Sequence, residues 1–206
     1  MTDIWPTIHA ERRSLADDLA DLSADQWYTP SLCTEWSVHD VVAHLTSAAK
    51  MTPPKFAARF AAAGFDFNKF AGRQVALEGK GGPAATLAAF ESVQSRQSAP
   101  PGPKDTWLGE AFVHGEDIRR PLGIPHSYPL SYVVRVITLY ANSNAIIGGK
   151  TRVAGLRLKA TDIDYSVGSG PLVEGPAVSL MLAATGRKSA LQDLSGEGVL
   201  ILQQRA

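Results

Sequence analysis

The chain has few of the features that mark secreted or membrane proteins. Cys33 is the single cysteine among 206 residues, so an internal disulfide is excluded and a reducing compartment is expected. The sequence has no apolar run of about 20 residues, which argues against a transmembrane helix. Its first residues show no basic stretch followed by an apolar run, so we expect no secretion signal. These absences favour a cytoplasmic protein.

An excess of charge of either sign is absent as well. The 20 Lys and Arg residues balance the 20 Asp and Glu residues, which gives a formal net charge of zero. Surfaces that bind nucleic acid or an anionic membrane normally carry an excess of basic residues. We therefore expect no nucleic acid and no membrane among the partners. The hydrophobic fraction of 45% is enough for an ordinary globular core.

Apolar residues at helical spacing predict that most of the chain before residue 150 is helical. Ser37 and Asp40 have the spacing of a capping box, which predicts the start of a helix. Pro83 fits the first turn of another helix, and Asp105 is expected to cap the next one. The expected helices cover residues 3–22, 37–50, 84–97, 105–121 and 130–146, with a weaker helical stretch over 55–79.

The pattern changes near residue 150, where we place a domain boundary. Residues 156–160 alternate with period two, as a half-buried strand does. Strand and turn signals, a short apolar helix and a final strand are then expected at 165–170, 176–185 and 199–202. The predicted fold class is α+β, with a helical bundle over residues 1–150 and a small α+β domain over 151–206.

Three side chains on the expected helices can bind a metal ion. Glu110 and His114 are four residues apart, so they project from the same face of a helix, one turn apart. His44, on a helix that faces them, would supply a third ligand. Three protein ligands leave a coordination position open for water or substrate, which is typical of a catalytic metal. The alternatives are ordinary ones: a hydrogen-bonded core histidine and a solvated glutamate.

Two carboxylates lie close in sequence to the candidate ligands. Asp40 is one turn before His44, and Asp117 is three residues after His114. Either carboxylate could accept a hydrogen bond from a ligand's ring N–H and fix its tautomer. The alternative role of Asp40 is helix capping, and that of Asp117 is surface charge.

The motifs that contain these residues resemble those of the mycothiol-dependent maleylpyruvate isomerase family, part of the DinB-like superfamily of metal-binding four-helix bundles. The resemblance to the first family motif lies in Trp36, Ser37, Val38, Asp40, His44 and Leu45, preceded by Leu32 and Cys33. The second motif is similar at Glu110, His114, Asp117 and Gly123. The C-terminal part resembles the family's sterol-carrier-like domain at 161–162, 168–170, 175–177, 185–187 and 194–196.

This resemblance implies a set of site residues. His44, Glu110 and His114 correspond to the metal ligands, with zinc as the expected ion and another divalent metal as the alternative. Mycothiol is the implied thiol cofactor or cosubstrate. Arg187 corresponds to a catalytic arginine that reaches from the small domain towards the metal pocket. A guanidinium can hold a carboxylate through two hydrogen bonds, which suits a small anionic substrate. Cys33 has no obvious base nearby in sequence and is expected to be structural.

The sequence leaves the reaction open. A thiolate that adds to an activated double bond and leaves after rotation gives cis–trans isomerisation, and one that stays gives thiol transfer. Activated water would instead give hydrolysis of a thiol conjugate. Two non-enzymatic alternatives are a binding protein for a small molecule or lipid, and a regulatory protein that acts through oligomer contacts. A homodimer is compatible with the family.

Overall fold

The computed structural model describes residues 3–145 and 147–205. The chain divides into two compact units, Met1–Pro125 and His126–Ala206. The first is helical and the second combines helices with a small sheet, so the predicted α+β fold class is confirmed. In the part of the chain that the structure describes, no helix combines the length and the hydropathy needed to cross a membrane.

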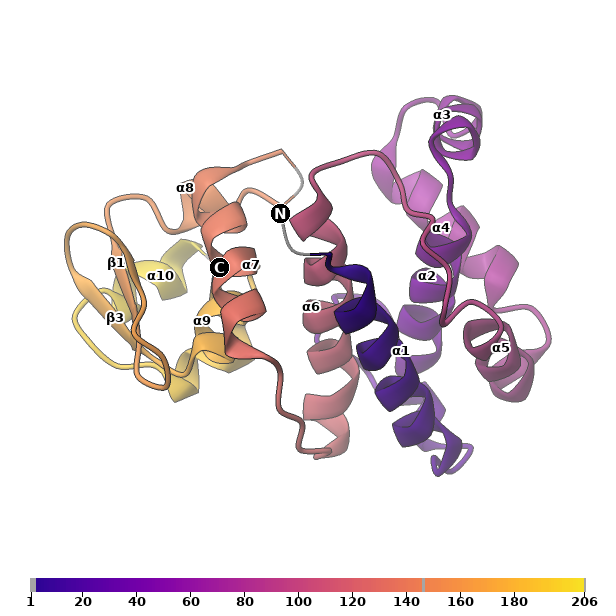
Figure 1. The fold of residues 1–206 in the computed structure, drawn as a ribbon, viewed down its shortest axis with the longest axis horizontal. Coiled ribbons are helices and arrows are strands. Elements are labelled where there is room, and N and C mark those ends of the chain that lie inside the picture. The colour runs from indigo at the N-terminus through magenta and orange to yellow at the C-terminus, as the bar shows by residue number, and fades with distance from the viewer. Residues whose placement is uncertain (1–2, 146, 206) are drawn as a thin grey trace. The chain divides into compact units, whose positions relative to one another are not determined.

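A four-helix bundle forms the centre of the first unit (Figure 1). Each helix of one pair packs against both helices of the other pair, which closes the bundle. The pairs are α1 (Trp5–Ala20) with α2 (Val38–Lys50), and α5 (Gly82–Glu91) with α6 (Lys104–Leu122). The core between them is apolar and fully or almost fully buried, and it includes Leu15, Leu19, Val38, Val41, Val42, Phe90 and Ile118.

The start of α2 follows from a local sequence signal. The Ser37 side chain accepts a hydrogen bond from the Asp40 backbone N–H, and the Asp40 carboxylate accepts one from the Ser37 N–H at 3.0 Å. The predicted capping box is therefore confirmed. Because the start of the helix is fixed, Val38, Val41 and Val42 all face the core.

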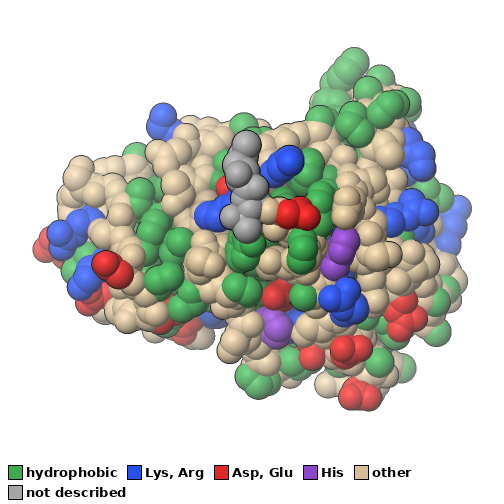
Figure 2. Space-filling model, viewed as in Figure 1, with side chains coloured by type: hydrophobic (Ala, Val, Ile, Leu, Met, Phe, Trp, Pro, Cys, Tyr) green, Lys and Arg blue, Asp and Glu red, His purple; other side chains and the backbone are tan. Residues whose placement is uncertain are grey.

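The weak helical stretch separates into α3 (Pro53–Ala62) and α4 (Phe67–Glu78). Gly64 adopts a left-handed backbone with φ 74° at this break. The two helices pack through phenylalanine rings, while Phe65 and Phe67 in the connection remain 72% and 53% exposed. Figure 2 shows the resulting hydrophobic patch over α3, beside surfaces on which both signs of charge are mixed.

Two helix boundaries differ from the prediction. α5 ends at Glu91, where a turn replaces the expected extension to residue 97. The expectation that Asp105 caps α6 is wrong, because Pro103 occupies the N-cap and Asp105 lies in the first turn. A carboxylate in the first turn still interacts favourably with the positive end of the helix dipole.

The second unit contains a three-stranded sheet in the order β2-β1-β3. β1 (Arg157–Ala160) pairs antiparallel with β2 (Ser166–Gly168) and parallel with β3 (Leu172–Gly175). The apolar helix α9 (Ala177–Ala184) packs against β1, β3 and α7 (Leu130–Asn142). The remaining elements are α8 (Gly149–Arg152), α10 (Val199–Arg205) and the 3-10 helices η1 (Gln26–Tyr28) and η2 (Lys188–Asp193), of which only η1 lies in the first unit.

The second unit differs from the expectation in four respects. Residues 199–202, expected to be a strand, form the start of α10, because a short apolar run does not by itself distinguish a strand from a buried helix. β3 was not expected. α7 ends at Asn142, before the expected end at residue 146, which lies outside the described residues. α7 belongs to the second unit, so the structural division falls after Pro125 rather than near residue 150.

Candidate metal centre

Three potential ligand atoms converge between α2 and α6. The Nε2 atom of His44 lies 2.9 Å from Oε2 of Glu110, and Nε2 of His114 lies 3.7 Å from the same oxygen. The two imidazole rings meet edge to face, with centroids 4.8 Å apart. One ligand atom from each residue lies within 4.8 Å of the others. The structure thus brings together the three residues that the sequence singled out.

The donor set and its spacing fit a divalent metal ion. Two imidazole nitrogens and a carboxylate oxygen are donors that zinc and other first-row divalent ions accept. Ligand bonds of about 2.0–2.1 Å place neighbouring donors of a tetrahedral site roughly 3.3 Å apart. The distances of 2.9 and 3.7 Å bracket that value. The side chains of His44, Glu110 and His114 keep 19%, 30% and 12% exposure, so a ligand has access to them.

Asp117 lies directly behind one of the imidazoles. Its Oδ2 atom is 2.8 Å from Nδ1 of His114, and its side chain is completely buried. A proton on Nδ1 donated to this carboxylate leaves the Nε2 lone pair available to a metal. This is the arrangement expected for Asp117, and its burial excludes the alternative role as surface charge.

Asp40 occupies a different position. Its carboxylate accepts hydrogen bonds from the backbone N–H and hydroxyl of Ser37, at 3.0 and 2.6 Å. Within the described residues, no hydrogen bond joins it to His44. The structure therefore places Asp40 in helix capping, the alternative role, and does not bring it to the ring of His44.

The turn before α2 forms one wall of the centre. The backbone N–H of Leu32 donates to the carbonyl of Asp117 at 3.1 Å, which ties the turn to α6. The ring of Trp36 packs against that of His44, with centroids 5.0 Å apart. A second group of potential ligand atoms, from Cys33, His114 and Asp117, also lies within 4.8 Å. Sequence reasoning missed this proximity of Cys33, since only the folded turn brings it to α6.

Arg187 belongs to the second unit, in the connection between α9 and η2. Its Nη1 atom donates to the carbonyl of Thr185 at 3.0 Å. Burial and, secondarily, the charge of Arg187 lower the pKa of Arg152. The second unit thus holds two guanidinium groups close enough to repel each other.

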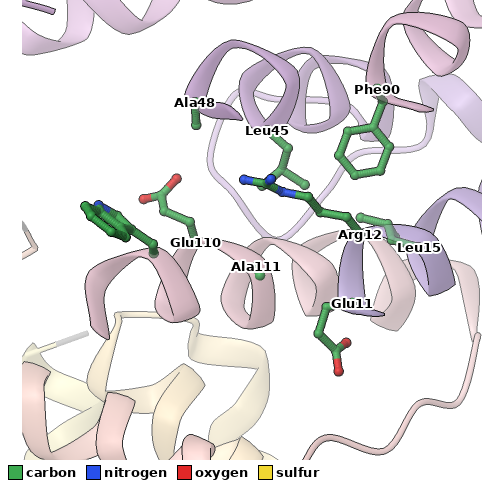
Figure 3. A pocket seen from close by; sticks show the side chains of 9 residues that line it. Glu11, Arg12, Leu15, Leu45, Ala48, Phe90, Glu110 and Ala111 are labelled. Carbon is green, nitrogen blue, oxygen red and sulfur yellow. The ribbon is translucent and has the colours of Figure 1, made fainter. Parts of the chain in front are cut away.

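A pocket opens beside Glu110 within the first unit. Its lining is contributed by all four bundle helices and includes Arg12, Leu15, Leu45, Phe90 and Glu110 (Figure 3). The empty space measures about 330 Å³, including the part open to solvent. Sequence reasoning did not select Arg12, because it stands in a charged stretch of an ordinary amphipathic helix.

Comparison with known proteins agrees with this architecture. Residues 8–99 match the family model described as the mycothiol maleylpyruvate isomerase N-terminal domain. The crystal structure of a single-residue mutant of the mycothiol-dependent maleylpyruvate isomerase is similar, with a TM-score of 0.66 and 13% identity. A second crystal structure of that enzyme gives a TM-score of 0.60 and 9% identity. Each alignment covers 94% of this chain and 91% of the other. No curated protein matches the sequence significantly.

Proposed function

We propose that this chain, a member of the mycothiol-dependent maleylpyruvate isomerase family, is a metal-dependent enzyme that uses a low-molecular-weight thiol such as mycothiol. The observation that carries the proposal is the convergence of His44, Glu110 and His114 on one point, where Glu110 also lines a pocket. Bundle packing alone gives no reason to place two imidazoles and a carboxylate together on facing helices. The proposed substrate is a small anionic molecule.

Each residue of the centre has a distinct role in this proposal. His44, Glu110 and His114 would hold zinc or another divalent ion, and Asp117 would keep the His114 ring in the tautomer that binds metal. When bound, such an ion stabilises a thiol as its thiolate at neutral pH. Trp36 would help to position the ring of His44, against which its own ring packs. Arg187 is proposed to hold a substrate carboxylate by two hydrogen bonds.

Isomerisation is the reaction most directly suggested by the family. The thiolate sulfur adds to one carbon of a conjugated cis double bond, and the π electrons move onto the conjugated carbonyl oxygen. Rotation about the resulting single bond follows. Return of the electrons re-forms the double bond in the trans geometry and expels the thiolate, so no atom is gained or lost. If the intermediate is protonated instead, the carbon–sulfur bond remains and the reaction is a thiol transfer.

Two other functions fit parts of the same structure. A metal-dependent hydrolase of a thiol conjugate would use the same three ligands. A non-catalytic small-molecule-binding protein is favoured by the apolar side chains of Leu15, Leu45 and Phe90 in the pocket. We also propose a cytoplasmic location, where a thiol cofactor stays reduced, and a homodimer as one candidate assembly.

The test is turnover of the zinc-loaded protein with mycothiol and maleylpyruvate, followed by proton NMR. A trans product without consumption of mycothiol identifies an isomerase, and a stable adduct identifies a transferase. Release of mycothiol from an amide-linked conjugate identifies a hydrolase. We expect one of these activities, and we expect Glu110→Ala to abolish it while the exposed control Glu91→Ala keeps it. Tight binding of these compounds without any turnover would instead favour the binding protein.

A further inference from the structure

The pocket beside Glu110 contains one cationic side chain among its described lining residues, Arg12 of α1. Figure 3 shows the Arg12 guanidinium extending into the pocket towards the side where Glu110 rises from α6. The neighbouring Glu11 extends away from the guanidinium, and its Oε2 atom lies 3.9 Å from Nη1 of Arg119. Arg12 is therefore the only positive charge that faces the metal ligands from within the described pocket lining.

Part of the Arg12 guanidinium is already engaged. Its Nη1 atom donates to the carbonyls of Arg96 at 2.8 Å and Val93 at 3.4 Å, just beyond the end of α5. Its Nε and Nη2 atoms have no hydrogen-bond partner, and the group makes no ion pair, within residues 3–145 and 147–205. Burial lowers its pKa to about 10, so the side chain is still charged at neutral pH. Partly buried charges normally have a counter-ion, because desolvation is costly.

We propose that Arg12 binds the carboxylate of the small-molecule ligand in the pocket beside Glu110. The inference rests on the proposed function, in that a thiol or its adduct occupies the neighbouring metal centre. It adds a substrate-binding residue that the family motifs do not contain.

The two remaining donors select the chemistry of the ligand. Nε–H and the adjacent Nη2–H point from the same edge of the guanidinium in parallel, a spacing that matches the two oxygens of a carboxylate. Water-sized groups have about 20 Å³ of room in the pocket, so only a small group such as the carboxylate end of an acid can enter it. Because α1 and α6 pack directly within one bundle, Arg12 has a defined position relative to Glu110.

A purely structural role for Arg12 is the main alternative, since its Nη1 atom ties α1 to the chain after α5. The carbonyl of Arg96 also has His9 as a neighbour, with Nε2 3.3 Å away, so it keeps a hydrogen-bond partner when Arg12 is replaced. Arg12→Gln removes the charge and the two-donor edge, whereas Arg12→Lys keeps the charge alone. Arg13→Gln changes an exposed arginine one residue away and serves as the matched control.

The experiment compares two thiols that differ by a carboxylate, 3-mercaptopropionate and 2-mercaptoethanol, by calorimetric titration of the zinc-loaded protein. After correction for thiol pKa, we expect wild type and Arg13→Gln to prefer the acid by about tenfold, as a charged bidentate contact provides. In Arg12→Gln the two thiols should bind with dissociation constants that differ by no more than about twofold. In Arg12→Lys the preference for the acid should lie between those of wild type and Arg12→Gln. The affinity for 2-mercaptoethanol should stay the same, which a general loosening of the bundle would not allow.

A second readout separates failure of this inference from failure of the proposed function. In ¹⁵N-labelled protein, the Nε–H resonance of Arg12 is identified by its loss in Arg12→Lys, and succinate is added without any thiol. We expect the resonance to shift with succinate. If neither thiol binds but the resonance shifts, the thiol function fails and the carboxylate site stands. An unmoved resonance, or an acid preference that survives in Arg12→Gln, overturns the assignment of Arg12.

Discussion

The two units of the chain hold their charged groups in opposite ways. In the first, two imidazole nitrogens, from His44 and His114, and the Glu110 carboxylate lie around one point. In the second, Arg152 and Arg187 place two positive charges near each other, and this contributes to the lowered pKa of Arg152. The first arrangement suits a cation and the second an anion. We therefore propose metal binding for the bundle and, in addition to the carboxylate contact proposed for Arg12, a contact with an acidic group for Arg187 in the C-terminal unit.

The proposed metal binding in the bundle depends most strongly on Asp117, the buried carboxylate hydrogen-bonded to His114. Asp117→Asn keeps the size of the side chain but removes its charge, so we expect the zinc dissociation constant to rise about 10–100-fold. A competition assay with a chromogenic chelator measures this. Asp40→Asn is the matched control, because its carboxylate bonds to Ser37 and not to a ligand. Equal effects of the two substitutions would contradict the distinction between them.

The proposed binding of an acidic group by the C-terminal unit is tested by replacing Arg187. We expect Arg187→Gln to lower kcat/KM for an acidic substrate by about tenfold, which corresponds to the loss of one charged hydrogen-bonded contact. Zinc content should be unchanged, because the ligands belong to the first unit. Steady-state kinetics and elemental analysis of the same sample check both points. Arg157→Gln, an exposed arginine on β1, is the control, and an equal loss there would remove the special role of Arg187.

The turn that presents Arg187 also allows a test in which stability and metal binding should separate. Gly186 has φ 90°, and a Cβ atom there would lie 3.2 Å from Cζ of Arg152. We expect Gly186→Ala to destabilise the second unit by about 1–2 kcal/mol and to leave zinc affinity unchanged. Denaturant unfolding measures the first effect. Gly72→Ala, in the interior of α4 with open space around it, should be neutral or stabilising.

The smallest expected effect concerns the helix that carries His44. Ser37→Ala removes the side-chain acceptor of the capping box and should lower the free energy of unfolding by about 1 kcal/mol. Zinc affinity should change by less than twofold, since the packed core still fixes α2. Thermal unfolding and zinc titration of the variant check this. A large loss of zinc affinity would show that the cap, and not the core, positions the ligand.

The residues that could be predicted from sequence are those whose signal is local. The capping box at Ser37, the helical spacing of Glu110 and His114, and the proximity of Asp117 to His114 all concern residues within four positions of each other. The sequence predicts less directly that α2 and α6 face each other. The apolar stripe on α2 shows only that this helix is buried against another one. The fold class followed from the change in periodicity near the strands.

The features that were missed depend on long-range packing. Cys33 reaches His114 only because its turn is tied to α6, and Arg12 reaches the pocket only because α1 packs on that helix. Helical periodicity predicts α7 as a helix but does not reveal which core it joins, and the structure places it in the second unit. The apolar run of α10 fits either kind of element, and its tertiary environment decides in favour of a helix.

Zinc content together with X-ray absorption at the zinc edge tests the central claim most directly. We expect about one zinc per chain in the loaded wild type, with two imidazoles among ligands at about 2.0–2.1 Å. His44→Ala and His114→Ala should each lose bound zinc, whereas His9→Ala, outside the centre, should retain it with an unchanged spectrum. A wild type that holds no divalent ion, or a zinc site that survives in both ligand variants, would contradict the assignment of this centre.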